Sequence, residues 1–346
     1  MKRLIWPTII AILVWNIVLS VYVSEITLNS ENETASVTII QNEVNGFSTD
    51  LTDIVEKVRS AIVTVETDIT SATATIIKQE EDTVYAVTNY HVIEGANSID
   101  LVLDNYQRVE VSLVGYDAIR DVAVLSFTSE YSFTPIVIGD SSLLKAGEFV
   151  LAIGSPISIQ YRGSLSFGIV SSSYRILDLS VGSNSYYIGM IQSDITMNSG
   201  NSGGPLVNMA GELVGLNTLE VTVDDADGLS FSLTCLELSY IIDAIIEDGS
   251  VTKNDLGIEY TSVQTMTNYQ KSSLGIQLDQ TAGLYISAIK SGFIASSLDI
   301  RVGDILVELN NVSVNDYEDL LEVEYSEETI ERALVIRDGE TVILGE

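Results

Sequence analysis

A serine surrounded by glycines stands at the centre of the segment Gly200-Asn201-Ser202-Gly203-Gly204-Pro205-Leu206. Crowded glycines permit a strained turn that exposes the serine hydroxyl and directs backbone N–H groups toward one point. Such a turn would place a nucleophile beside a cradle for developing negative charge. By itself the segment also fits a glycine-rich β-turn without chemistry.

A serine hydroxyl is a weak nucleophile at neutral pH and needs an adjacent base, most often an imidazole. The chain contains one histidine, His91, in the segment Val87-Thr88-Asn89-Tyr90-His91-Val92 after an expected strand. A lone histidine is more often an ordinary surface or core residue. Its place after a strand, in a chain with such a serine turn, makes His91 the candidate base.

The imidazole in turn needs a carboxylate that fixes its tautomer and stabilises the imidazolium. The segment from Gly115 to Leu125 offers two carboxylates, Asp117 and Asp121. Asp121 opens an apolar strand and is therefore expected to be partly buried, whereas Asp117 is expected to serve the turn. The sequence thus predicts a catalytic triad of His91, Asp121 and Ser202.

Composition excludes several other classes of function. The 49 acidic and 16 basic residues give a formal charge of −33, which would repel phosphate backbones, so no nucleic-acid partner is expected. We interpret the charge as solubilising, since no EF-hand loop suggests calcium. Cys235 is the only cysteine, which excludes an internal disulfide and a cysteine-ligated zinc. We therefore expect neither a metal nor a cofactor.

The first residues indicate where the protein resides. After Lys2 and Arg3, residues 4–23 carry no charge, and as a helix of about 30 Å they could cross a bilayer. A cleaved signal peptide is the alternative, but its apolar region usually spans only about 7–15 residues. A retained anchor is favoured. The positive-inside rule then leaves the amino terminus in the cytoplasm and the remaining residues outside.

The 346 residues suffice for two domains after this anchor and a polar linker. Short β-branched runs separated by turn residues predict an all-β barrel or sandwich. The runs are Ala61–Val65, Thr83–Thr88, Val109–Gly115, Val122–Phe127, Phe149–Ile153, Glu212–Asn217 and Leu229–Leu233. A helix over Leu238–Ile246, capped by Gly249, is expected to close this domain.

A second, smaller unit is expected after Ser250. A short helix over Tyr317–Tyr325 and several strand candidates predict a mixed α/β unit, with a hairpin turn at Asp338-Gly339. The strand candidates are Gly257–Tyr260, Leu284–Ala288, Ile305–Leu309 and Leu334–Leu344.

The three catalytic segments resemble signatures of the HtrA (Deg) group of trypsin-like serine proteases: Thr-Asn-x-His-Val, Asp-x-Ala-Val-Leu and Gly-Asn-Ser-Gly-Gly-Pro-Leu. They also follow the His, Asp, Ser order of chymotrypsin. The resemblance covers about residues 51–346, because the group carries C-terminal PDZ domains. It implies a mainly β protein with a chymotrypsin-like double β-barrel and a small α/β PDZ domain. The expected division is an anchor (residues 1–23), a linker (24–50), a protease domain (51–250) and a PDZ domain (251–346).

By this resemblance His91 is the general base and then the general acid, Asp121 orients it, and Ser202 attacks the peptide carbonyl. The N–H groups of Gly200 and Ser202 would form the oxyanion hole, with Asn201 lending its backbone to the loop.

The resemblance also implies a specificity pocket flanked by Leu216, Asn217 and Thr218. Met197, Leu216 and Leu229 are its candidate lining, and a small or medium aliphatic residue is expected before the scissile bond. Packing of the barrel core is the alternative for these three apolar residues.

The sequence departs from the group's pattern in two regions, before the histidine and in the second domain. Ser71-Ala72-Thr73-Ala74-Thr75 replaces a Ser-Gly-Ser-Gly-like turn before the histidine. In the second domain, Leu256-Gly257-Ile258 resembles the loop that binds a peptide carboxylate, but Asn254-Asp255 precede it in place of an aromatic residue. Ser291–Gly303 likewise lacks the usual Pro-Ala and Ala-Gly-Leu.

The function expected from the sequence is therefore a membrane-anchored serine endopeptidase that cleaves misfolded or regulatory proteins outside the cytoplasm. Its PDZ domain would bind peptide carboxy termini, and trimers are usual in the group. One alternative is a non-catalytic chaperone or receptor on a protease fold. Another is a secreted glutamyl-endopeptidase-like enzyme without a PDZ domain, whose chain after Ser250 would be unrelated.

Overall fold

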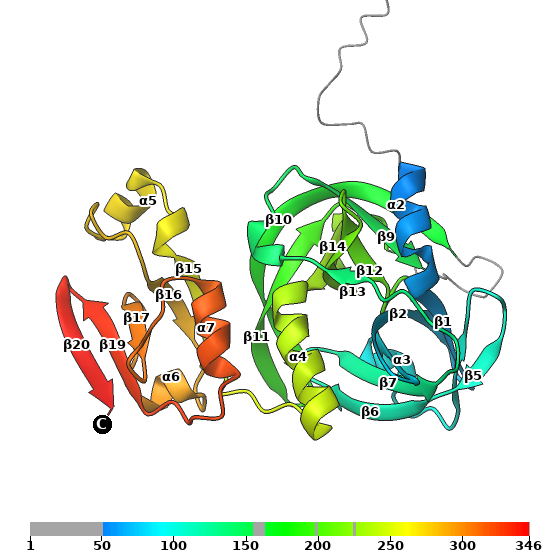
Figure 1. Cartoon of the computed structure of the whole chain (residues 1–346). Helices are drawn as coiled ribbons and strands as arrows, with labels where there is room; N and C mark the ends of the chain where they lie inside the picture. Colours follow the sequence, from blue (N-terminus) through cyan, green and yellow to red (C-terminus); the bar gives the residue numbers. More distant parts are fainter. Residues whose placement is uncertain (1–50, 155–162, 198–199, 224–225, 346) are drawn as a thin grey trace, which may run out of the picture. The chain divides into compact units, whose positions relative to one another are not determined.

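The protein folds into three β-sheets, as seen in a computed structural model that describes residues 51–154, 163–197, 200–223 and 226–345 (Figure 1). Two seven-stranded sheets precede a six-stranded one. The expected anchor and linker, residues 1–23 and 24–50, lie outside the described residues. Within the described ranges, no helix is long and apolar enough to span a bilayer.

The first sheet carries the histidine and aspartate candidates. Its order is β5-β4-β1-β2-β3-β7-β6. The strands are β1 (Ile62–Thr67), β2 (Ser71–Glu80), β3 (Thr83–Thr88), β4 (Ile99–Val102), β5 (Arg108–Glu110), β6 (Ser112–Asp117) and β7 (Val122–Thr128). In the β3–β7 pair, Thr88 lies opposite Ala123. This antiparallel register brings the end of β3, just before His91, next to the start of β7, just after Asp121.

The second sheet closes on itself. Its strands pair in the ring β12-β9-β10-β11-β14-β13, because β12 also pairs with β13, and the short β8 joins β13 in parallel. The strands are β8 (Val137–Ile138), β9 (Phe149–Gly154), β10 (Ser164–Val181), β11 (Asn184–Ser193), β12 (Pro205–Asn208), β13 (Glu212–Val223) and β14 (Ala226–Thr234). The glycine-rich serine segment lies directly before β12.

Helices flank these sheets: α2 (Leu51–Val58), α3 (Tyr90–Ile93) and α4 (Cys235–Asp248), with 3-10 turns at Arg59–Ala61 and Ser141–Leu143. The predicted long helix is confirmed as α4. Its N-cap is Thr234, and Gly249, with a φ of 71°, ends it by donating its N–H to the Ile245 carbonyl. The buried apolar face of α4 packs into one core with residues of both sheets.

The third sheet has the order β15-β16-β17-β19-β20, with β18 paired to β17. Its strands are β15 (Ile258–Ser262), β16 (Leu284–Ile289), β17 (Ile305–Leu309), β18 (Val312–Ser313), β19 (Arg332–Arg337) and β20 (Glu340–Gly345). The helices are α5 (Asn268–Ser273), α6 (Ile294–Ser297) and α7 (Tyr317–Glu324), with a 3-10 turn at Val263–Thr265. The hairpin predicted at Asp338-Gly339 is confirmed: both residues have positive φ, 54° and 81°, and they join β19 to β20.

Some elements escape the sequence patterns. The helix α2 is only eight residues long and buries just Ile54 and Val58, one turn apart. The long strands β10 and β11 are rich in Ser and Tyr. Because β10 is largely half-buried or exposed, its sequence does not show the β-branched runs that are typical of a core strand. Val109–Gly115, expected as one strand, spans the end of β5 and most of β6.

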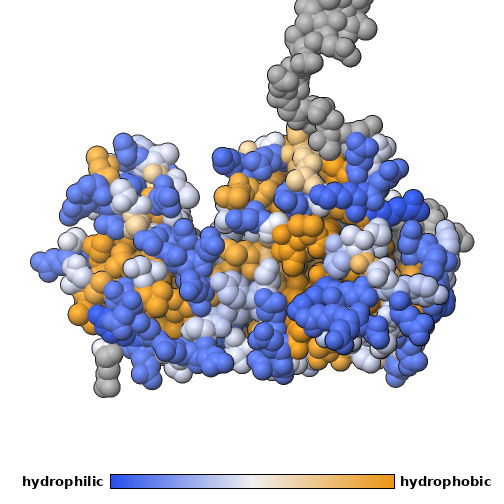
Figure 2. Space-filling view, in the orientation of Figure 1, coloured by the Kyte–Doolittle hydropathy of each residue, from blue (hydrophilic) through white to orange (hydrophobic). Residues whose placement is uncertain are grey.

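Figure 2 shows hydrophilic residues over much of the described surface in its view, as a charge of −33 leads one to expect.

Candidate active site

His91 is fixed by two contacts with a single carboxylate. It stands on α3, and its side chain is 50% exposed. Its backbone N–H donates to Asp121 Oδ1 at 2.8 Å, and its Nδ1 lies 2.6 Å from Asp121 Oδ2. With Nδ1 bonded to the carboxylate, Nε2 is the ring nitrogen that can accept a proton.

Asp121 adopts a backbone conformation that is unusual for a residue with a side chain. Its φ is 57°, in the left-handed region. Its carboxylate also accepts the Thr218 hydroxyl at 2.8 Å, and the side chain is 28% exposed. The hydrogen bond to Asp121 raises the pKa of His91 above its ordinary value, while partial burial opposes the rise. The arrangement therefore favours the imidazolium that a general base becomes.

Ser202 lies in a loop that packs against the segment leading into His91. The loop glycine Gly203 has a φ of 75°, and a Cβ on it would come within 2.3 Å of the Thr88 hydroxyl and 3.0 Å of the Asn89 nitrogen. Only glycine allows this approach. Among the described residues, Ser202 makes no hydrogen bond with His91, as is common for a nucleophile and base without substrate.

Thr73 supports the nucleophile loop in a way that motif comparison missed. It lies in the Ser71–Thr75 segment, which forms the start of β2 instead of a glycine turn. The buried Thr73 hydroxyl donates to the Gly200 carbonyl at 2.5 Å, and its N–H donates to the Ser202 carbonyl at 3.2 Å. Thr73, in the segment that departs from the group's pattern, thus contacts the nucleophile loop directly.

The proposed oxyanion residues are consecutive in this loop. Gly200 has a φ of 107°, a conformation that favours glycine. Asn201 is buried, and its carbonyl accepts the Gly204 N–H at 3.0 Å.

Two residues expected near the specificity pocket belong to the hydrogen-bond framework of the site. Asn217 is fully buried; its Nδ2 donates to the Pro205 carbonyl at 2.9 Å, and its carbonyl accepts the Gly203 N–H at 2.9 Å. Thr218 bonds Asp121, as described above. Met197 is 7% exposed, Leu216 is inaccessible in the core, and Leu229 packs against that core.

An open cleft of about 610 Å³ lies beside His91. Its polar wall includes His91, Asp121 and Thr218, and the hairpin of β10 and β11 supplies an apolar wall. The apolar lining residues are Leu179, Val181, Ile188 and Met190. Sequence reasoning missed them because it did not detect the hairpin.

In the second unit, the loop Leu256-Gly257-Ile258 already binds the chain's own carboxylates. The Leu256 N–H donates to Glu324 Oε1 at 3.0 Å, and the Gly257 N–H donates to Asp255 Oδ1 at 2.9 Å. Ile258 begins β15, opposite Ile289 of β16. Two of the three N–H groups expected to hold a peptide carboxylate are therefore occupied.

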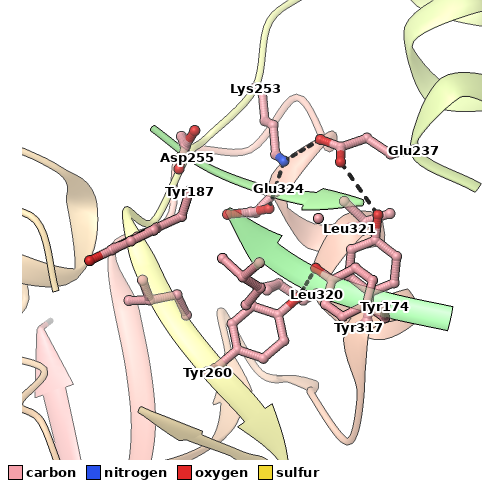
Figure 3. A pocket seen from close by; sticks show the side chains of 13 residues that line it. Tyr174, Tyr187, Glu237, Lys253, Asp255, Tyr260, Tyr317, Leu320, Leu321 and Glu324 are labelled. Atoms are coloured by element: carbon pink, nitrogen blue, oxygen red, sulfur yellow. Dashed lines mark hydrogen bonds and ion pairs between the residues drawn. The ribbon is translucent and has the colours of Figure 1, made fainter. Parts of the chain in front are cut away.

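The side chain of Tyr174 fills the space between β15 and α7. Figure 3 shows it beside Tyr260 and Tyr317. Its hydroxyl lies 2.7 Å from that of Tyr260, and its ring centroid lies 4.1 Å from that of Tyr317. Tyr174 stands in a bulge of β10 and lies over Gly189 of β11, where any Cβ would meet the ring at 2.3 Å. Only about 20 Å³ of cavity remains, roughly the space of one water.

A buried ion cluster adjoins both this cavity and Asp121. Glu237, 2% exposed, accepts Arg120 Nε at 3.2 Å and Lys253 Nζ at 2.7 Å. Lys253 also pairs with Glu324, at 3.1 Å (Figure 3), and Arg120 with Asp255, at 2.9 Å. Burial alone would raise the pKa of Glu237, but Lys253 and Arg120 outweigh it and lower that pKa to about 2. Glu237 is therefore charged.

Among the described residues, no group of three or more His, Cys, Asp or Glu side chains is arranged to hold a metal ion. Cys235 is buried, and burial raises the pKa of its thiol, which makes it a poor nucleophile.

Comparison with known proteins agrees with this fold. Residues 72–216 match the trypsin-like peptidase domain family, and residues 262–330 match the PDZ domain family. A solved structure described as the HtrA-type protease AlgW with tripeptide superposes with a TM-score of 0.61 at 27% identity, over 85% of this chain and 95% of that chain. The two sheets and the third unit are thus a double β-barrel and a PDZ-like domain.

Curated relatives define the family. The chain is 32% identical over 274 residues to the serine protease Do-like HtrB of Bacillus subtilis (strain 168), covering 78% of this chain and 60% of the relative. It is also 32% identical over 274 residues to the Do-like HtrA of Lactococcus lactis subsp. lactis (strain IL1403), covering 77% of this chain and 67% of the relative. The chain belongs to the Do-like HtrA family of serine proteases. It spans 60% and 62% of the two Bacillus subtilis relatives' lengths.

Proposed function

We propose that this protein is a serine endopeptidase that forms an acyl-enzyme intermediate on Ser202. The observation that carries the proposal is the double contact of the Asp121 carboxylate with the backbone N–H and Nδ1 of His91. The packing of Gly203 against the segment before His91 supports it, because it places the serine loop beside the base.

In the proposed reaction, Ser202 Oγ attacks the scissile carbonyl carbon while His91 Nε2 takes the hydroxyl proton. A C–O bond forms, the carbonyl π bond opens, and the N–H groups of Gly200 and Ser202 bind the resulting oxyanion. The oxyanion collapses, the C–N bond breaks, and the leaving amine takes the proton from His91. A water molecule, activated by His91, then attacks the acyl carbon and releases Ser202. Asp121 stays ionised and stabilises the imidazolium throughout.

The experiment is incubation of the purified full chain with unfolded casein. We expect cleavage by the wild type and none above background with Ser202→Ala. Binding of casein without cleavage would overturn the proposal and favour a chaperone or receptor that uses the fold without its chemistry.

We propose unfolded or regulatory proteins as substrates, with aliphatic side chains near the scissile bond. The apolar wall of the cleft beside His91 supports this preference, because an aliphatic side chain loses contact with water there. Trapping with the inactive Ser202→Ala variant, followed by mass spectrometry, would identify the physiological substrate.

For the PDZ-like domain, we propose binding of peptide carboxy termini at Leu256-Gly257-Ile258, with the peptide added beside β15. In the structure Tyr174 fills the space between β15 and α7, and Glu324 occupies the Leu256 N–H. A peptide must displace both groups before it can bind. Its apparent affinity is therefore lowered in proportion to the fraction of molecules in which the groove is open.

Removing the Tyr174 ring is therefore expected to strengthen peptide binding several-fold. The measurement is calorimetric titration of the full-length wild type and Tyr174→Ala with peptides ending in apolar residues, each compared with its carboxy-amidated form. Tyr106→Ala, which changes a tyrosine that is 72% exposed, is the matched control and should behave as wild type. If amidated and free peptides bind equally, or neither binds, the carboxylate loop is wrongly assigned.

We propose that residues 4–23 retain the chain at the cell membrane with residues 24–346 outside the cytoplasm. The charge-free segment supports retention at the membrane. The location outside the cytoplasm is supported by a relative described as a probable periplasmic serine endoprotease DegP-like, of Marinomonas sp. (strain MWYL1), 37% identical over 232 residues. Protease added to intact cells or spheroplasts is expected to digest the catalytic domain. A soluble mature protein that begins near residue 24 would instead identify a cleaved signal.

We also propose a homotrimer. A partly exposed aromatic pair supports a self-association surface: Phe149 and Phe167 stack with centroids 5.1 Å apart, and Phe167 and its neighbour Leu165 are 41% and 42% exposed. Association of copies would remove this apolar area from water.

A further inference from the structure

Asn89 joins the three segments that carry His91, Asp121 and Thr218. It is fully buried and lies between β3 and α3, two residues before His91. Its Nδ2 donates one hydrogen bond to the Asp121 carbonyl and another to the Thr218 hydroxyl oxygen, each at 2.8 Å. One amide group therefore contacts the start of β7 and the strand β13 of the second barrel.

The second of these bonds determines where the Thr218 proton points. A hydroxyl has one proton, and its oxygen accepts from Asn89, so the proton is free to be donated elsewhere. The acceptor 2.8 Å away is Asp121 Oδ2, the same oxygen that contacts His91 Nδ1. Asn89 thus orients the hydroxyl that supports the carboxylate.

The orientation of the Asn89 amide follows from the same contacts. If Oδ1 and Nδ2 were exchanged, Oδ1 would face the Asp121 carbonyl, and two acceptors would meet. In the observed orientation Oδ1 is buried and has no hydrogen-bond partner among the residues that the structure describes. Asparagine at an N-cap ordinarily bonds the first turn of its helix, but the Asn89 side chain makes no such bond with α3. Its hydrogen-bonding capacity is directed to Asp121 and Thr218 instead.

We propose that Asn89 is a positioning residue for Asp121. It binds the main-chain carbonyl of Asp121 directly and acts on the carboxylate of Asp121 through Thr218. The first bond supports the left-handed backbone of Asp121, which has a φ of 57°. The second keeps a donor on the oxygen that faces His91. The inference rests on the proposed function, because the carboxylate it positions matters for hydrolysis through His91.

Loss of Asn89 is expected to change both the rate and the basicity of His91. A carboxylate that loses the Thr218 donor interacts more strongly with the imidazolium, so the pKa of His91 rises further. Glu94, the other acidic group that acts on His91, is unchanged in every variant. Misplacement of the base also slows the reaction by about 10- to 100-fold.

The test uses the full chain with Asn89→Ala, Thr218→Val and the double variant. Because His91 is the only histidine, ¹⁵N-histidine labelling gives one imidazole to titrate by NMR, whether or not the protein cleaves anything. The second readout is the rate of cleavage of fluorescein-labelled casein. Both single variants should raise the pKa of His91 and slow cleavage, and the double variant should be no slower than Asn89→Ala, since the two residues act in series. Thr218→Ser, which keeps the hydroxyl, should recover most of the rate lost in Thr218→Val.

Asn97→Ala is the matched control, because it removes an exposed asparagine–aspartate bond, to Asp68, away from His91. A His91 titration that is identical in wild type, Asn89→Ala and Thr218→Val would overturn the inference, even if the rates fell through loss of folded protein. Rate losses that multiply in the double variant would also overturn it. If the pKa of His91 is raised in both single variants but the wild type cleaves nothing, the positioning role stands and the proposed function fails.

Discussion

Ser202→Ala, His91→Ala and Asp121→Asn are each expected to slow hydrolysis of unfolded casein by several orders of magnitude while the protein stays folded. The three groups act as a unit: without the serine no acyl-enzyme forms, without the imidazole the hydroxyl keeps its proton, and without the carboxylate the ring loses its tautomer. Combining two of the substitutions should cost little more than one. The measurement is casein cleavage by purified variants whose circular dichroism matches the wild type.

Two conservative changes at exposed positions outside the site, Ser98→Ala and Asp82→Asn, serve as matched controls. Both should cleave casein at the wild-type rate. A folded variant of Ser202, His91 or Asp121 that keeps near wild-type activity would remove that residue from the triad.

Glu237→Gln is expected to lower the free energy of unfolding by about 3–5 kcal/mol, because it removes the buried carboxylate that two buried cations, Arg120 and Lys253, share. Glu237 is 2% exposed and contacts both Arg120 and Lys253. Urea denaturation at pH 7 measures the change. The ion pair of Glu66 with Arg108 offers the control: Glu66→Gln should cost less than about 1 kcal/mol, since water reaches both groups, with Arg108 57% and Glu66 20% exposed.

The destabilisation by Glu237→Gln should depend on pH with a defined sign. The pKa of Glu237 is lowered in the folded protein to about 2, from an ordinary value of 4.5. Its charge therefore contributes fully above about pH 4.5, and the contribution is lost as the pH falls from there toward 2. Unfolding curves of wild type and Glu237→Gln should converge over that range. A difference that stays constant from pH 7 to pH 3 would mean that the charge of Glu237 is not what stabilises the fold.

The sequence predicts the parts of the site that depend on local spacing. Glycines around Ser202 and a strand ending before His91 are visible within a few residues, and the helix signals of α4 lie within one segment. The pairing of β3 with β7, which brings the ends of two of these segments together, is seen in the structure and does not follow from the sequence patterns. The features that the sequence predicts are local.

Contacts between distant side chains were not predictable in the same way. The bond from Thr218 to Asp121 spans 97 residues, and the one from Tyr174 to Tyr260 spans 86. Each depends on the register of a long strand, and the bulge that presents Tyr174 shifts the register of β10 against β11. No periodicity in the sequence records such a shift. The sequence therefore predicts Thr218 only as a residue of the specificity pocket, and the bond from its hydroxyl to Asp121 is seen in the structure alone.

The most direct measurement of the proposed chemistry is the site of covalent modification by diisopropyl fluorophosphate, which phosphorylates only a serine activated as a nucleophile. The treated full-length protein would be digested, and the modified peptide would be identified by mass spectrometry. We predict one adduct, on Ser202, that disappears in His91→Ala and in the urea-unfolded chain. A folded wild type that gains no adduct on Ser202, or one that is modified equally well without His91, would contradict the assignment of Ser202 and His91 as nucleophile and base.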